Sequence, residues 1–88
     1  LPTETRFGLV LLDGHHDGPA TERYVRALLP HLAEGAVLAV DDIDWSPGMR
    51  AAWRRLRALP GVAASVDLGG MGLLRLHWRQ APEHFVLR

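Results

Sequence analysis

The sequence predicts an α/β fold in the order βαβαββ, with the last strand antiparallel to the strand before it. Two short, continuous apolar runs at 7–12 and 36–40 are typical of strands that are covered on both faces. Each run is followed by a segment whose apolar residues recur at helical spacing. The glycine pair Gly69 and Gly70 separates the last two strand-like segments and indicates a hairpin.

The first strand, 7–12, leads through a loop rich in Gly, Asp and His into the first helix. Asp17 or Gly18 can cap this helix, and Pro19 suits its first turn because a proline there loses no helical hydrogen bond. We expect one apolar stripe of the helix to face the sheet, formed by Tyr24, Val25, Leu28, Leu29 and Leu32.

The segment between this helix and the second strand contains two residues that interrupt regular structure, Pro30 and Gly35. Pro30 is expected to end or kink the helix near Leu29, because proline removes a backbone donor and disfavours helical geometry in the residue before it. Residues 31–35 then indicate a short turn that Gly35 closes. The second buried strand follows at 36–40.

The second helix is predicted to begin at Ser46 and Pro47, since serine is a preferred N-cap and proline a preferred first residue. The sequence Pro60-Gly61 ends it. Its arginines are expected to face solvent, and its other face carries the predicted core residues Met49, Ala52, Trp53, Leu56 and Leu59.

The remaining chain predicts two strands and a tail. The strands at 62–68 and 72–78 are joined by the glycine turn, so we expect them to pair antiparallel. The tail at 80–88 contains one more short apolar piece, 85–87.

Length and composition predict one small soluble domain over residues 1–88, with two helices that are few for covering both faces of a parallel sheet. A net charge of zero argues against a nucleic-acid or membrane-surface binder held by bulk electrostatics. The chain has no cysteine, which excludes disulfides and thiolate metal sites. No apolar run approaches the roughly 20 residues that span a bilayer, and no signal peptide opens the chain, so a cytoplasmic location is expected.

Carboxylates follow both buried strands. Asp13 comes directly after the first strand, and Asp41 and Asp42 come directly after the second. In a right-handed βαβ unit the two strands are parallel, so both acidic ends lie at the same carboxyl edge of the sheet. Open α/β sheets bind ligands at that edge. Because Mg²⁺ and similar cations take oxygen ligands, the three carboxylates predict a divalent-cation or substrate site.

A cation at this edge would lower the pKa of a bound substrate hydroxyl. His15 or His16 is then the candidate base, because histidine titrates near neutral pH. The alternative for each aspartate is structural, since strand-end aspartates also cap helices and order loops. Trp45, in the acidic loop, is the better candidate for lining a pocket, whereas Trp53 is expected in the core.

Residues 7–16 resemble the fourth strand of class I S-adenosylmethionine-dependent methyltransferases, an apolar run followed by D-G-x-H. Residues 29–42 are similar to the stretch that leads into the fifth strand of that family, and 62–78 resembles its closing strand pair, in which the seventh strand is antiparallel. The resemblance implies the C-terminal half of a Rossmann-like methyltransferase sheet. D-G-x-H together with a double aspartate on the next strand resembles the small-molecule O-methyltransferase branches.

This resemblance implies functions for particular residues. Asp13 and Gly14 would lie at the S-adenosylmethionine cofactor. His16 matches the histidine of D-G-x-H, and His15 stands where one sugar O-methyltransferase branch has an acidic base. The substrate would be a small-molecule methyl acceptor. Mg²⁺ or another divalent cation would be held by the three strand-end carboxylates Asp13, Asp41 and Asp42.

The same resemblance implies an incomplete cofactor site. The family binds S-adenosylmethionine chiefly with its first two strands, and no counterpart of them precedes Phe7 in this sequence. We therefore expect the cofactor to bind the full-length protein and this chain alone to be inactive. The strand Phe7–Leu12 would lack its usual neighbour, and an open apolar edge favours a homo-oligomer paired through that strand.

Two other functions are compatible with parts of the pattern. The chain is alternatively a non-enzymatic assembly or interaction half-domain. A receiver-like phosphoacceptor domain also uses an acidic Mg²⁺ pocket, but it needs a lysine at a later strand end, and this sequence contains no lysine.

Overall fold

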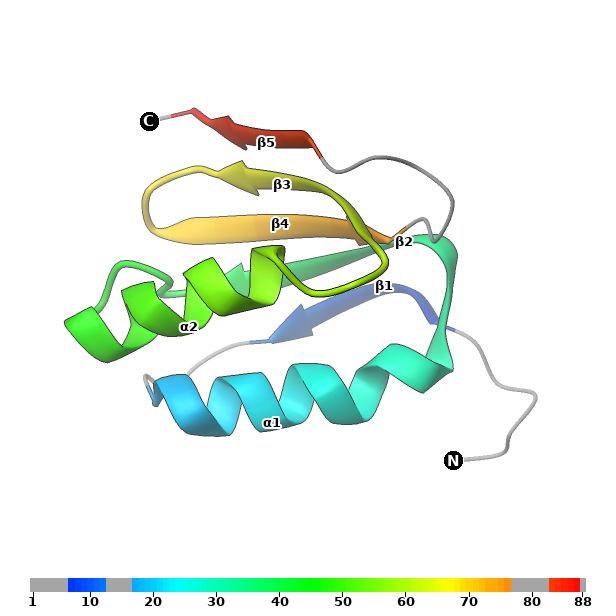
Figure 1. Cartoon of the computed structure of the whole chain (residues 1–88), viewed down its shortest axis with the longest axis horizontal. Helices are drawn as coiled ribbons and strands as arrows, with labels where there is room; N and C mark the ends of the chain where they lie inside the picture. Colours follow the sequence, from blue (N-terminus) through cyan, green and yellow to red (C-terminus); the bar gives the residue numbers. More distant parts are fainter. Residues whose placement is uncertain (1–6, 13–16, 77–82, 88) are drawn as a thin grey trace.

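The computed structural model describes residues 7–12, 17–76 and 83–87. Within them a five-stranded sheet packs against two helices (Figure 1). The α/β class and the βαβαββ order are confirmed, and a fifth short strand is added to the sheet. In chain order the elements are β1 (Phe7–Leu12), α1 (Gly18–Leu28), the 3-10 turn η1 (Leu29–His31), β2 (Leu32–Asp41), α2 (Pro47–Arg57), β3 (Val62–Asp67), β4 (Met71–Leu76) and β5 (Glu83–Val86).

The strands lie in the order β1-β2-β4-β3-β5. β1 and β2 are parallel, and so are β3 and β5. β4 lies between β2 and β3 and is antiparallel to both, as the glycine hairpin predicts. β2 and β3 therefore run in the same direction, and their carboxyl ends lie at one edge. The arrangement is consistent with a partial Rossmann-like fold.

Both helices begin at the residues that the capping pattern favours. Asp17 is the N-cap of α1, and its Oδ1 accepts a hydrogen bond from the Ala20 backbone N–H at 3.1 Å. Ser46 is the N-cap of α2, and its Oγ accepts from the Met49 N–H, also at 3.1 Å. These bonds satisfy donors that the first helical turn leaves unpaired. Among the described residues, neither helix has the length and apolar character needed to cross a membrane.

The expected turn before the second strand is wrong in part, because β2 begins at Leu32 rather than Ala36. Leu32 already pairs with Phe7, and the next paired residue on β2 is Val37, opposite Leu9. The extra residues form an irregularity in the ladder that includes Gly35, whose φ is 82°. Glycine adopts this left-handed geometry without a steric penalty. Gly35 therefore bends a continuous strand instead of ending a separate turn.

The predicted apolar stripe of α1 is also wrong in part, because α1 ends at Leu28, so that Leu29 lies in η1 and Leu32 in β2. Val25 is fully buried, but the neighbouring Tyr24 is 46% exposed. The buried face of α1 consists of Gly18, Thr21 and Val25, and part of it packs against α2 rather than the sheet. Thr21, for example, contacts Met49 of α2 through its hydroxyl, 3.7 Å from the sulfur. Tyr24 is therefore not part of the buried face of α1.

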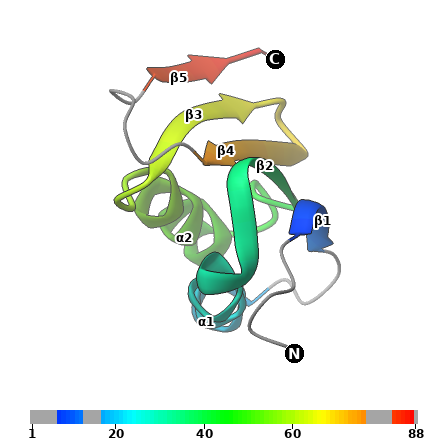
Figure 2. The same cartoon turned by 90° about the vertical axis from the view of Figure 1, so that its right-hand side faces the viewer.

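Figure 2 shows both helices on the same face of the sheet. The core lies between them and that face and consists of Val25, Leu32, Ala36, Leu38, Val40, Ile43, Trp53, Leu56, Val62, Leu74 and Leu76. No described helix covers the opposite face, as the shortage of helices predicts. A row of apolar residues crosses all five strands there, in paired register: Leu11, Ala39, Leu73, Val66 and Phe85.

Candidate functional site

The structure places part of the predicted acidic site. Asp41 is the last residue of β2, and Asp42 follows it. The parallel pairing of Leu12 with Val40 brings the end of β1 beside the start of this acidic pair. The other predicted site residues, which lie outside the described residues, are Asp13, Gly14, His15 and His16. Their proposed contributions to the site stay predictions.

The two described aspartates shape the turn that leaves β2. Asp41 accepts a hydrogen bond through its Oδ1 from the Asp42 backbone N–H at 2.9 Å, and the same N–H donates to the Gly70 carbonyl at 2.7 Å. Asp42 has φ 57° and is the one described residue other than glycine in the left-handed region. Such backbone geometry is uncommon, is most readily adopted by Asn and Asp, and often occurs at functional sites.

Asp41 and Asp42 are both half-buried, and their oxygens have the chemistry that a hard cation prefers. Within the described residues, however, no three His, Asp, Glu or Cys side chains are placed to hold a metal ion together. The two aspartates therefore supply at most part of a coordination shell, and Asp13 is the predicted third ligand. The hydrogen bond accepted by Asp41 also supports the structural alternative for that residue.

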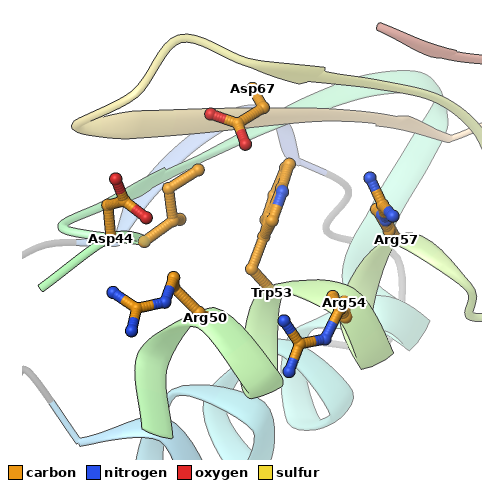
Figure 3. A pocket seen from close by; sticks show the side chains of 7 residues that line it. Asp44, Arg50, Trp53, Arg54, Arg57 and Asp67 are labelled. Carbon is orange, nitrogen blue, oxygen red and sulfur yellow. The ribbon is translucent and has the colours of Figure 1, made fainter. Parts of the chain in front are cut away.

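A cavity of about 150 Å³ lies near the same edge of the sheet. Figure 3 shows its lining side chains, which come from the loop after β2, from α2 and from the end of β3. They are Ile43, Asp44, Arg50, Trp53, Arg54, Arg57 and Asp67. Trp45, which is expected to line a pocket, does not line this cavity, and its side chain is 62% exposed.

Trp53 is a core residue, as predicted, and also forms a wall of the cavity. The side chain is 5% exposed, and its ring packs against Gly72 of β4. A Cβ at Gly72 would lie 2.8 Å from the ring Cζ2 and closer still to two other ring atoms. Gly72 is therefore needed for the ring to lie on the sheet. The indole Nε1 is buried without a hydrogen-bond acceptor among the described residues.

Sequence reasoning missed Asp67, which is the last residue of β3 and only 6% exposed. Its Oδ1 accepts a hydrogen bond from the Gly69 N–H at 2.8 Å, which orders the hairpin. The signal that identified Asp41, an acidic residue at the carboxyl end of an apolar strand, applies equally to Asp67. Arg50, Arg54 and Arg57 were expected only to face solvent, although their spacing places them along one side of α2.

Two further polar contacts join elements outside this edge. Ser65 of β3 and His84 of β5 share a hydrogen bond of 2.6 Å between Oγ and Nδ1. Ser65 is 1% exposed, so its hydroxyl is closed to a substrate, and the pair holds β5 to the sheet. Glu22 of α1 accepts hydrogen bonds from Arg55 of α2. The bond and charge of Arg55 hold the pKa of Glu22 below its ordinary value.

A comparison with protein families matched residues 1–43 to a family described as a methyltransferase domain. No curated protein and no solved structure gave a match. The matched segment includes β1, α1, β2 and the acidic pair Asp41 and Asp42. The match supports a methyltransferase domain as the source of the segment that carries the acidic strand ends.

Proposed function

We propose that the full-length protein is a class I S-adenosylmethionine-dependent methyltransferase that methylates a hydroxyl oxygen of a small molecule. The observation that carries this proposal is the position of the acidic edge. The parallel pair β1 and β2, with Asp41 and Asp42 after it, lies inside the segment that matches a methyltransferase domain. Ligands of open α/β sheets bind at the carboxyl ends of such strands.

The reaction assigns a distinct task to each predicted group. When bound, S-adenosylmethionine supplies an electrophilic methyl group, and a divalent cation would lower the pKa of the acceptor hydroxyl. The acceptor hydroxyl would take up the methyl group that the cofactor supplies and would lose its proton to a base, for which we propose His15 or His16. Asp13 and Gly14 would contact the cofactor. The proposed ligands of the cation are Asp13, Asp41 and Asp42.

Metal binding is tested by titrating the full-length protein with Mg²⁺ in a calorimeter. The Asp41→Ala variant is expected to lose most of the affinity of the wild type, because a carboxylate ligand is removed. Asp44→Ala is the matched control, since it removes a nearby carboxylate that is outside the predicted set. Equal Mg²⁺ binding by wild type and Asp41→Ala would exclude the metal assignment.

Cofactor binding is tested separately by thermal unfolding of the full-length protein with S-adenosylmethionine or its demethylated product. A ligand that binds the native state raises the unfolding temperature as its concentration rises. A concentration-dependent rise supports the methyltransferase proposal. The absence of any rise with either compound would contradict it and favour the second candidate function.

That second candidate is an assembly half-domain, and one observation favours it. β1 lies at an edge of the described sheet, and its Leu9 and Leu11 side chains are 73% and 60% exposed. An exposed apolar edge strand offers unpaired backbone groups to a second copy of the chain. We propose a homo-oligomer through Phe7–Leu12, and light scattering at high micromolar concentration tests it. A strictly monomeric species would exclude this assembly.

A further inference from the structure

The cavity beside α2 has walls of opposite charge. Figure 3 shows Asp44 and Asp67 on the side of the sheet, with the arginines on the side of α2. Asp67 is held by its bond to Gly69, so one acidic wall is fixed. Three arginines of α2, Arg50, Arg54 and Arg57, also line the cavity, and their guanidinium groups form no ion pair with another described residue.

Trp53 lies between these two walls (Figure 3). Its ring is held against Gly72, so it is a rigid surface of the cavity. The face of an indole ring attracts cations, because its π electrons carry partial negative charge. The buried Nε1–H lacks an acceptor among the described residues, and a buried donor without an acceptor is unfavourable.

The volume sets the size of the group that the cavity can hold. A cavity of this volume, about 150 Å³, holds a molecule of roughly the size of benzene, or about six non-hydrogen atoms. A simple anion of that size would be attracted by the arginines but repelled by Asp44 and Asp67. A simple cation would be attracted by Asp44 and Asp67 but repelled by the arginines. A molecule with one charge of each sign finds a partner on both walls.

We propose that this cavity binds a small zwitterion of the α-amino-acid type. The ligand carboxylate faces the arginines of α2, where guanidinium groups match carboxylates in geometry and charge. The ligand ammonium faces Asp44 and Asp67 and lies near the Trp53 ring. The inference is independent of methyl transfer, because it uses none of the residues proposed for that reaction.

The test follows the indole N–H signals of the full chain by ¹H–¹⁵N NMR during titration with L-alanine. Each of two control compounds replaces one charged group of L-alanine by a methyl group: isobutyrate lacks the ammonium, and isopropylamine lacks the carboxylate. We expect the Trp53 signal to move and saturate with L-alanine at a concentration at least tenfold lower than with either control. The Trp45 signal is the internal control, and Trp53→Phe assigns the Trp53 signal.

Two variants locate the binding. Arg54→Gln is expected to weaken L-alanine binding about tenfold, which corresponds to about 1.4 kcal/mol. Arg23→Gln is the matched control, because Arg23 is an exposed arginine on α1 that does not line the cavity. Since both positions are on the surface, both variants are expected to fold, and unchanged indole signals without ligand verify this.

Three results would overturn the proposal. The first is a Trp53 signal that none of the compounds moves. The second is saturation by isobutyrate or isopropylamine at the same concentration as L-alanine, which would make the cavity an anion site or a cation site. The third is an equal loss of L-alanine binding in the Arg54 and Arg23 variants, which would place the binding elsewhere.

Discussion

The two faces of the sheet share one backbone ladder but differ in what covers them. On the helix side Leu38 and Leu74 pair with each other and are fully buried. On the opposite side Leu11 and Phe85, at the two ends of the apolar row, are 60% and 46% exposed. The continuous apolar strands are typical of a sheet with two helical layers, and the described residues supply one. Apolar composition thus marks a face as suited to burial, but only a packed layer makes it a core.

The largest expected difference between the faces comes from truncating one leucine on each. Leu38→Ala removes a fully buried side chain and is expected to lower the free energy of unfolding by about 2–5 kcal/mol. Leu11→Ala removes an exposed one and should change it by less than about 0.5 kcal/mol. Urea unfolding of both variants measures the difference. Similar losses would show that the row containing Leu11 is covered in solution.

A second comparison introduces a methyl group on the covered face. Gly72→Ala forces a Cβ into the Trp53 ring and is expected to destabilise the fold by about 1–3 kcal/mol, because a packed core cannot accommodate it without movement. Gly70→Ala is the matched control, since a Cβ there would meet no atom within 4 Å. Thermal unfolding compares the two variants. An unaffected Gly72→Ala protein would contradict the packing of Trp53 on β4.

The helical layer itself is tested at its N-caps. Ser46→Ala removes the side-chain acceptor for the Met49 N–H and should cost about 1 kcal/mol. Asp17→Ala removes the equivalent bond in α1 and should cost a similar amount. Ser46→Thr keeps a hydroxyl acceptor and should retain most of the stability. Chemical unfolding gives the values, and no loss in Ser46→Ala would exclude the capping bond.

The smallest effect is expected from the contact between the two helices. Because Arg55 lowers the pKa of Glu22 in the folded chain, the ionised carboxylate stabilises the native state. This contribution is present above the ordinary pKa of 4.5 and is lost as the pH falls through the lower folded value. The stability difference between wild type and Glu22→Gln should therefore shrink below pH 4.5. A difference that stays constant from pH 7 to pH 3 would contradict the assignment.

The parts of the fold that were predictable depend on neighbours in the sequence. Ser46 before Pro47 marks a helix start because the serine oxygen bonds to a backbone group three residues away. The glycines after Asp67 mark a hairpin because Gly69, with φ 94°, adopts turn geometry that other residues avoid. Leu32 was predicted on the apolar stripe of the first helix, but it is the first residue of β2. Its partner, Phe7, is on β1 and is distant in the sequence.

The candidate site was predictable to a smaller extent. Asp41 and Asp42 are predicted site residues because they end an apolar strand; the structure places them at the carboxyl edge of the parallel pair, and their function stays a prediction. The cavity was not identified, because its walls come from three segments that are separate in the sequence. Arg54, for example, is an ordinary exposed helix residue until α2 is packed beside the end of β3.

The sequence by itself determined the order of the elements, the helix caps, the hairpin and the acidic strand ends, since each follows from backbone preferences over a few residues. Tertiary structure alone decided which face of the sheet is covered, why Trp53 needs Gly72 opposite it, and that Asp67 lines one cavity with the arginines of α2. These features depend on strand register and on how the layers pack. Burial and charge pairing are set by groups that meet only after the chain has folded.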